Sequence, residues 1–379
     1  MTNNIKYLCI DDQADDTVDR LLRAIESGGG IELERWTPTQ LDEILPAIKK
    51  FIDANQAQGV GLLLDLRLDM DSNNDIARVK YRGPTLAQEL RTRMAEREIP
   101  AVPIVLWSVN AKFESSFSNE NTSKDLFDDV YEKDREVLEN PSIVTKRLIS
   151  LAKGYGLIRG AAGAAMAVNL VKLGEDVDSM IYAQFIDELK EVVEKRSAHD
   201  AARLLLNELI RAPGLLIDEP LLAARLGIDI GASSESWEVI KNAIASARYT
   251  GLFYEGWDRW WWYKAENWWF DSFPDSGDIR AIDSSSRVEL INNKLGTAAV
   301  PASPICDNYS SNFFSICAGL DLPLDPNDGL RVVSRGAREW QDPIYVSIHA
   351  ALERVGRGNK WRLDPLERQR LDSIKEEMS

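Results

Sequence analysis

The sequence predicts an α/β protein, in which a doubly wound, five-stranded parallel sheet is followed by a helical region and a small tryptophan-rich α+β domain. Short apolar runs alternate with amphipathic helical patterns about five times over residues 1–158, as is typical of α/β domains. The runs at 62–64 and 104–107 are apolar throughout, which indicates parallel strands covered on both faces. Beyond them helical patterns dominate, and six of the eleven tryptophans fall within residues 257–269. We therefore expect domains at residues 1–158, 159–230 and 231–379.

Each element of the first domain has its own pattern. A strand at 5–10 ends in two aspartates, and a helix at 17–26 closes at three glycines, where glycine relieves the strain of a left-handed helix end. After these glycines, the same kinds of pattern predict a second strand and a second helix. Further strands are expected at 61–64, 103–107 and 129–132, and further helices at 86–96 and 142–153. Gly154 and Gly156 are predicted to close the domain.

The rest of the chain is predicted to be mainly helical. Apolar residues recur at three- and four-residue spacing, which indicates a buried stripe along each helix. Such helices are expected at 158–173, 177–196, 198–211 and 219–226. Ser233 or Ser234 would cap a further helix that reaches residue 251. A loop-rich stretch at 301–328 and a helix at 364–378 complete the prediction.

Composition excludes several classes of protein. Acidic residues outnumber basic ones by 61 to 45, which gives a formal net charge of −16 and weighs against bulk binding of nucleic-acid phosphates. Cys9, Cys306 and Cys317 are too few for a disulfide scaffold, and the first residues lack the pattern of a signal peptide. No apolar run reaches the roughly 18 residues that predict a membrane span. We therefore expect a cytoplasmic protein that contacts neither nucleic acid nor membrane.

Five polar residues stand at the carboxyl ends of predicted strands, where doubly wound sheets place their ligand sites. They are Asp11, Asp12, Asp65, Ser108 and Lys133. Three neighbouring carboxylates repel one another unless a cation such as Mg2+ joins them. Asp65, on the middle strand, is the expected nucleophile toward phosphorus. The other aspartates would hold the ion, Ser108 would donate a hydrogen bond to a phosphoryl oxygen, and Lys133 would neutralise charge.

These residues resemble the receiver domain of response regulators, a flavodoxin-like fold, over residues 1–158. The resemblance rests on IDD at 10–12, LDLRL at 64–68, IVLWS at 104–108 and VYEK at 130–133. It implies that Asp65 takes a phosphoryl group from a histidine kinase or phosphotransfer protein, and that the main-chain carbonyl of Arg67 completes the Mg2+ shell. In that family phosphorylation changes the surface offered to a downstream protein partner.

The chain also departs from the receiver pattern. An insert occupies residues 69–75, where the family turns tightly, and a long polar segment occupies residues 110–125. Asp134 stands where the family has proline after the lysine. Val130 takes the place of the aromatic switch residue, and Tyr131 would point to the opposite face of its strand. These departures are compatible with phosphorylation but weigh against the family's usual coupling of a hydroxyl to an aromatic side chain.

The tryptophan cluster has two interpretations. It either binds a partner through exposed aromatic faces or forms the core of a small domain. Three consecutive tryptophans cannot all face one way, so we expect some to be partly exposed unless a partner covers them. The residues in question are Trp257, Trp260, Trp261, Trp262, Trp268 and Trp269.

Other chemical signals are weaker. Cys306, Cys317 and His349 lack the spacing of a zinc site. His199, near a helix start, is more typical of a structural histidine than of a phosphorelay residue. Basic residues near the C-terminus favour a solvated face over contact with phosphate or an acidic partner. They are Arg331, Arg335, Arg338, Arg354, Arg357, Lys360 and Arg362.

The leading prediction is a signalling protein that accepts a phosphoryl group on Asp65 and relays the signal to a C-terminal protein-interaction region. The alternative is a non-catalytic, receiver-like adaptor in a multi-protein assembly, such as a bacterial defence or stress system. A third hypothesis places an effector enzyme or DNA-binding output in residues 159–379. That region resembles no family and holds no phosphate-binding glycine loop, nucleophile elbow or HExxH motif. The sequence thus leaves open whether the protein is an enzyme, and the motifs indicate at most self-phosphorylation or dephosphorylation at Asp65.

Overall fold

The computed structural model describes residues 4–13, 16–69, 79–109, 125–160, 169–172, 180–334, 336–358 and 361–377. Most of the predicted insert at 69–75 and of the polar segment at 110–125 lies outside these residues, as does part of the helix expected at 158–173. The chain divides into two compact units. The N-terminal unit comprises Met1–Asn207 with Thr250–Trp257, and the C-terminal unit comprises Glu208–Tyr249 with Asp258–Ser379. The predicted three-domain division stays a prediction.

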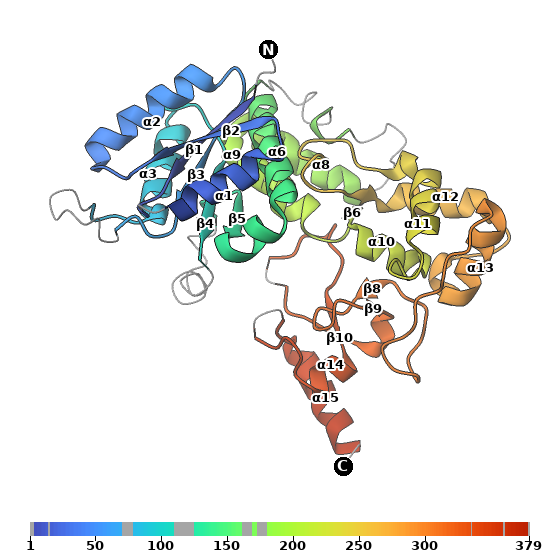
Figure 1. The fold of residues 1–379 in the computed structure, drawn as a ribbon. Coiled ribbons are helices and arrows are strands. Elements are labelled where there is room, and N and C mark those ends of the chain that lie inside the picture. The colour runs from blue at the N-terminus through green and yellow to red at the C-terminus, as the bar shows by residue number, and fades with distance from the viewer. Residues whose placement is uncertain are drawn as a thin grey trace. The chain divides into compact units, whose positions relative to one another are not determined.

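A five-stranded parallel sheet forms the centre of the N-terminal unit (Figure 1). Its strands lie in the order β2-β1-β3-β4-β5, and every neighbouring pair is parallel. This is the doubly wound arrangement that the alternating pattern predicts, and it is compatible with a flavodoxin-like fold. The strands are β1 (Ile5–Ile10), β2 (Ile31–Trp36), β3 (Val60–Asp65), β4 (Ile104–Ser108) and β5 (Asp129–Glu132).

Helices cover both faces of this sheet, because side chains alternate along each strand. On one face Leu8 and Ile10 of β1 join a core that the apolar residues of α2 and α3 complete. On the other face the Tyr7 hydroxyl donates to the main-chain oxygen of Leu148, 2.8 Å away in α6. The helices of this unit are α1 (Asp16–Glu26), α2 (Leu41–Asn55), α3 (Gly83–Ala95), the π-helix η1 (Lys133–Val137), α6 (Pro141–Gly160), α8 (Met180–Lys195) and α9 (Ala198–Arg203).

The predicted end of the helix at residue 153 is wrong, because α6 continues through Gly154 and Gly156 to Gly160. Gly154 is needed for packing and does not end the helix. A Cβ atom at Gly154 would lie 2.1 Å from the ring of Phe253, so only glycine lets the 250–257 segment approach the helix so closely. Lys153 also pairs with Glu255 at 2.8 Å on the same side. The segment thus belongs to the N-terminal unit although it is far away in sequence.

The C-terminal unit combines helices with three small antiparallel sheets, each of two strands. The predicted helix at 219–226 is found, whereas the one expected to reach residue 251 ends at Ala243. The helix expected at 198–211 is α-helical only to Arg203 and continues as a π-helix, η2 (Leu204–Ile210), which joins the two units in sequence. None of the described helices is long and apolar enough to cross a bilayer.

Its elements, in chain order, are β6 (Leu216–Ile217), α10 (Glu219–Leu226), α11 (Ser234–Ala243), η3 (Ala245–Ala247), β7 (Trp260–Trp261), α12 (Trp262–Ser272), η4 (Ile279–Ala281), α13 (Ser284–Leu295), β8 (Ser315–Ile316), β9 (Pro323–Leu324), η5 (Pro326–Asp328), β10 (Gly329–Arg331), β11 (Tyr345–Ser347), α14 (Ile348–Leu352) and α15 (Pro365–Glu377). The strands pair β6 with β7, β8 with β9 and β10 with β11. One hydrophobic core gathers around α10 to α13, and a second gathers around β10, β11 and α14.

Candidate functional site

The carboxyl edge of the parallel sheet brings together the polar residues that the sequence places at strand ends. Asp65 is the last residue of β3, and Ser108 is the last residue of β4. Asp11 follows β1, and Lys133 follows β5. Parallel strands end at the same edge, so residues far apart in the chain become neighbours. Asp11, Asp65, Ser108 and Lys133 are all buried there, with at most 6% of each residue exposed.

Lys133 connects two carboxylates at this edge. Its Nζ atom lies 2.7 Å from Oδ2 of Asp11 and 2.6 Å from Oδ1 of Asp65. The same ammonium group lies 4.7 Å from the ring centroid of Trp107, within the range of a cation–π contact. Trp107 of β4 is paired with Asp65 of β3 in the sheet, so both side chains point to the same face. Lys133 is thus held by two ion pairs and an aromatic ring.

The backbone after β3 holds the second oxygen of Asp65. The main-chain N–H of Arg67 donates to Oδ2 of Asp65 at 2.8 Å. Gly83, the first residue of α3, packs directly against this turn, and its N–H donates to the main-chain oxygen of Leu66. A Cβ atom at Gly83 would lie 2.2 Å from the main-chain oxygen of Asp65. Gly83 therefore lets α3 begin beside the turn that follows Asp65.

Burial dominates the electrostatics of the site. It raises the pKa of Asp65 from 3.8 to about 6, since the nearby positive charge of Lys133 only partly opposes it and Asp11 adds repulsion. Burial alone would lower the pKa of Lys133, but Asp65 and Asp11 raise it above its ordinary value. Lys133 is therefore charged at neutral pH, and Asp65 gains an ionised form as the pH passes about 6.

The carboxylate of Asp65 keeps the capacity to react. Each of its oxygens accepts one hydrogen bond, from Lys133 or from the Arg67 N–H, and a carboxylate offers about four lone-pair positions in all. Ser108 lies on the adjacent strand, with 1% of the residue exposed. Asp12 is half-buried next to Asp11, whose Oδ1 accepts from the N–H of Gln13 at 3.1 Å.

The part of the chain that the structure describes holds no group of three or more His, Cys, Asp or Glu side chains placed to bind a metal. Mg2+ needs fewer protein ligands than that, because it is commonly held by one or two carboxylates together with water and phosphate oxygens. Asp12, Asp65 and the main-chain carbonyl of Arg67 are ligands of the type that Mg2+ prefers, since all three offer oxygen. The predicted ligand set of Asp11, Asp12, Asp65 and the main-chain carbonyl of Arg67 stays a prediction.

Two neighbours of the site were not predicted as site residues. Trp107 lies inside the strand pattern that predicts Ser108, but nothing in that pattern says that its ring faces Lys133. Gly83 precedes Pro84, and a proline at this position predicts the start of a helix but gives no indication of a functional site. The proximity of Trp107 and Gly83 to the site is visible only in contacts between strands and helices that are distant in the chain.

His199 belongs to a second buried network at the opposite end of the sheet. The Asp128 carboxylate accepts from Arg91 at 2.7 Å and from the Tyr155 hydroxyl at 2.6 Å. His199 Nδ1 lies 2.9 Å from the Tyr155 oxygen, and its Nε2 lies 2.8 Å from the main-chain oxygen of Asp125. Although burial opposes it, Arg91 together with His199 holds the pKa of Asp128 well below its usual range. These contacts fit the structural interpretation of His199.

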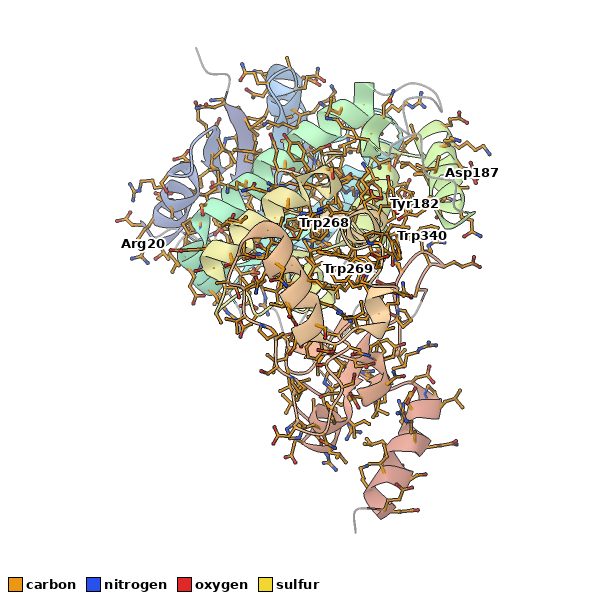
Figure 2. The ribbon with its side chains drawn as sticks, turned by 90° about the vertical axis from the view of Figure 1, so that its right-hand side faces the viewer. Arg20, Tyr182, Asp187, Trp268, Trp269 and Trp340 are labelled. Atoms are coloured by element: carbon orange, nitrogen blue, oxygen red, sulfur yellow. The ribbon has the colours of Figure 1, made fainter. Side chains whose placement is uncertain are left out.

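The expectation that some of the cluster tryptophans are partly exposed is wrong for the consecutive three, since Trp260, Trp261 and Trp262 are all at least 93% buried. Their side chains point in different directions, but each is buried because the chain changes from β7 to α12 within the triplet. Trp269 is fully buried and Trp268 is half-buried on α12 (Figure 2). Trp257 is buried in the N-terminal unit. The core interpretation of the cluster is the one that these positions favour.

The remaining candidates are two cysteines with His349 and the basic residues near the C-terminus. Cys317 is buried, and its Sγ accepts from the Ser347 N–H at 3.2 Å, whereas Cys306 is half-buried and His349 is exposed. Arg335 and Lys360 lie outside the described residues. The other basic residues near the C-terminus are exposed: Arg331, Arg338, Arg354, Arg357 and Arg362.

No model of a known protein family matches this sequence, and no curated protein matches it either.

Proposed function

We propose that the N-terminal unit is a receiver-like signalling module that accepts a phosphoryl group on Asp65. The observation that carries this proposal is the position of Lys133, buried with its Nζ 2.6 Å from Asp65 and 2.7 Å from Asp11 at the carboxyl edge of the sheet. A lysine at this place supplies positive charge where a phosphoryl group on Asp65 would bring negative charge. The resemblance of the strand-end motifs to receiver domains points to the same chemistry.

The proposed step is a simple displacement. An oxygen of the Asp65 carboxylate forms a bond to phosphorus while the bond from phosphorus to the donor breaks. With acetyl phosphate as donor, acetate leaves with the bonding electrons, and Asp65 becomes an acyl phosphate. The hydroxyl of Ser108 would donate to a phosphoryl oxygen, and the ammonium of Lys133 would pair with another.

Magnesium is the ion proposed for this site. Asp11, Asp12, Asp65 and the main-chain carbonyl of Arg67 would supply its protein ligands. When bound, the ion would neutralise phosphoryl charge. The donor set fits, because it is made only of oxygen and leaves part of the octahedral shell to water and phosphate. A buried carboxylate whose pKa is raised to about 6 is also one that a nearby cation would stabilise in its ionised form.

The natural donor proposed is a histidine kinase or phosphotransfer protein in the cytoplasm, and the proposed output is a changed surface for a downstream protein. The direct test incubates the full chain with acetyl phosphate and Mg2+ and reads the intact mass. We expect wild type to gain the mass of one phosphoryl group and Asp65→Ala to gain none. Equal labelling of both proteins, or none of wild type, would sink the proposal.

A second candidate is a receiver-like adaptor that is never phosphorylated. The observation in its favour is closure of the site, since Asp65 is 94% buried and already paired with Lys133. The burial of Asp65 limits the access of a phosphodonor to its carboxylate. If this candidate is correct, Asp65→Asn leaves partner capture and the biological response intact, whereas the first proposal expects the variant to abolish the response. The hypothesis of an enzyme or DNA-binding output in the C-terminal region stays a prediction.

A further inference from the structure

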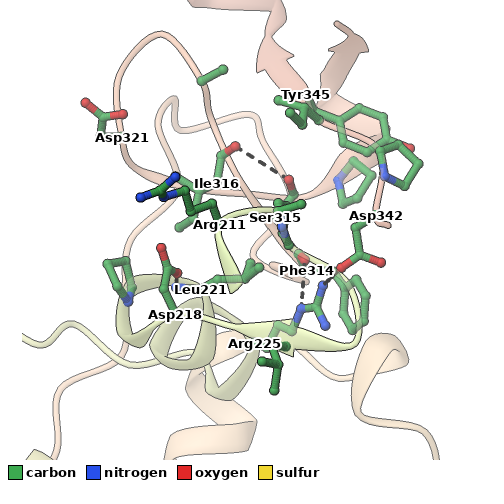
Figure 3. A pocket seen from close by; sticks show the side chains of 18 of the residues that line it. Arg211, Asp218, Leu221, Arg225, Phe314, Ser315, Ile316, Asp321, Asp342 and Tyr345 are labelled. Carbon is green, nitrogen blue, oxygen red and sulfur yellow. Dashed lines mark hydrogen bonds and ion pairs between the residues drawn. The ribbon is translucent and has the colours of Figure 1, made fainter. Parts of the chain in front are cut away.

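The C-terminal unit contains a cavity of about 660 Å³, within the usual size range of small-molecule sites (Figure 3). It lies between the start of α10, the segment after η2 and the loops on either side of β8 and before β11. Much of its wall is apolar, with side chains such as Leu221, Ile316 and Tyr345. This cavity lies within one unit of the chain, apart from the Asp65 site.

Four arginines and three aspartates line the cavity. Figure 3 shows Arg211 on one side, with Asp218 and Asp321 nearby. Asp218 caps α10, because its Oδ1 accepts from the Leu221 N–H at 3.1 Å. Arg259 is oriented by main-chain oxygens and donates from Nε to Ile210 at 2.6 Å. Charged groups on an otherwise apolar wall are the usual means by which a pocket orients a polar ligand.

The opposite side of the cavity carries two cations on one aromatic ring. The guanidinium groups of Arg225 and Arg280 lie 3.9 Å and 4.1 Å from the ring centroid of Phe314. Arg225 is 99% buried and pairs with Asp342 at 2.5 Å, while its Nε donates to the main-chain oxygen of Phe314. Arg280 is more exposed, and its guanidinium is 4.0 Å from Glu266. The contacts hold both guanidinium planes in place.

Positive charge exceeds negative charge in this lining by one unit, since four arginines face three aspartates. Burial lowers the pKa of Arg225, and the nearby charge of Arg280 lowers it further, against the opposing effect of Asp342. Such a pair of neighbouring cations gains stability from an anion placed between or beside them. Arginine also matches phosphate oxygens with two parallel donors, which suits it to phosphate binding.

We propose that this cavity binds a nucleoside phosphate, whose phosphate pairs with the arginines and whose sugar hydroxyls donate to Asp218 or Asp321. The aspartates decide against a bare phosphate ion or a simple organic acid, because carboxylates repel anions but accept hydrogen bonds from hydroxyl and amino groups. The half-buried ring of Tyr345 and the arginine planes provide flat surfaces for a base. Phosphate recognition here would rest on side chains, since the sequence holds no phosphate-binding glycine loop.

The test is calorimetric titration of the full chain with AMP, ADP, ATP and GTP, and with adenosine and pyrophosphate as separated halves. We expect at least one nucleotide to bind, and each half to bind at least about tenfold more weakly. Arg211→Gln and Arg280→Gln should each weaken nucleotide binding by about tenfold, the usual effect of losing a charge-assisted hydrogen bond. The matched control Arg368→Gln, on an exposed face of α15, should leave affinity unchanged.

A variant that fills the cavity distinguishes nucleotide binding inside it from binding to charged groups on the protein surface. Ala318→Phe adds volume to the lining without changing any charge, and should abolish binding. Circular dichroism and thermal unfolding verify that each variant is folded, and the arginine variants decide the matter if Ala318→Phe does not fold. The proposal is overturned if no nucleotide binds below about 1 mM, if pyrophosphate binds as tightly as the nucleotides, or if the arginine variants bind like wild type. Asp65→Ala should bind nucleotide normally, so this test is independent of phosphorylation.

Discussion

The Nζ atom of Lys133 lies 2.6 Å from Oδ1 of Asp65, although the two residues are 68 positions apart in the chain. Both side chains are almost fully buried, with 2% of the Lys133 side chain and 8% of the Asp65 side chain exposed. A buried ion pair of this kind gives little net stability, but removing one partner leaves an uncompensated buried charge. The site is therefore expected to tolerate loss of Lys133 poorly.

Lys133→Met tests this expectation, because methionine keeps the length of the side chain and removes its charge. We expect the free energy of unfolding at pH 7 to fall by about 3–5 kcal/mol, since Asp11 and Asp65 lose their shared cation. Urea titration gives the measurement. Lys49→Met is the control, because Lys49 and its partner Asp53 are both more than 40% exposed, and the expected loss is about 0–1 kcal/mol. Equal losses in the two variants would contradict the account.

Asp65 should make stability depend on pH in a definite direction. Its pKa rises from 3.8 to about 6 in the folded protein, so the folded state holds the proton more tightly than the unfolded state does. The resulting stabilisation is complete below about pH 3.8 and is lost as the pH rises through about 6. Wild type should therefore lose about 2–2.5 kcal/mol relative to Asp65→Asn between pH 4 and pH 7, measured without Mg2+. A constant difference between the two proteins over this range is the result that would refute it.

Two glycines of α6 offer a matched pair. Gly154→Ala should lower the free energy of unfolding by about 1–3 kcal/mol, because its Cβ would meet the Phe253 ring. Gly156→Ala should instead raise it by about 0.5–1 kcal/mol, since beyond its own stretch of helix no atom of the described residues lies within 4 Å of that Cβ, and alanine favours the helix. Thermal unfolding of both variants provides the comparison. Opposite signs indicate that the 250–257 segment is packed on α6, and equal stabilisation would show that it is not.

The tryptophan cluster yields a further comparison on α12. Trp269→Ala should cost about 3–5 kcal/mol, because the ring is fully buried and lies 4.6 Å from the ring of Phe273. Phe270→Ala, at the next position, should cost less than about 1 kcal/mol, since 44% of Phe270 is exposed. Chemical denaturation distinguishes the two. If Trp269→Ala were as mild as Phe270→Ala, the core interpretation of the cluster would fail.

Much of the N-terminal unit was predictable from local patterns. Continuous apolar runs that end in Asp65 and Ser108 identify buried parallel strands, and strand ends of one sheet necessarily share an edge. This is why the neighbours Asp11, Asp65 and Lys133 were found without a structure. The helix ends were less predictable, since Gly154 resembles a stop signal but serves a contact with Phe253, which lies about a hundred residues later.

The C-terminal unit was much less predictable. Its strands have only two or three residues each, too few for an alternating pattern to be visible. The orientations of Trp260, Trp261 and Trp262 depend on a change from strand to helix that their identities do not reveal. The arginines of the cavity are spread from Arg211 to Arg280, and only tertiary packing brings them together with Phe314.

The central claim is that Asp65 is the phosphoacceptor, and the most direct test is to find where the phosphoryl group resides. After incubation with acetyl phosphate and Mg2+, borohydride reduces an acyl phosphate to an alcohol, and peptide mass spectrometry locates the reduced residue. We expect the reduced residue at position 65 alone, and a strong decrease of this signal in Lys133→Met. Reduction at Asp11 or Asp12 in place of Asp65, or unreduced Asp65 in every peptide, would contradict the account.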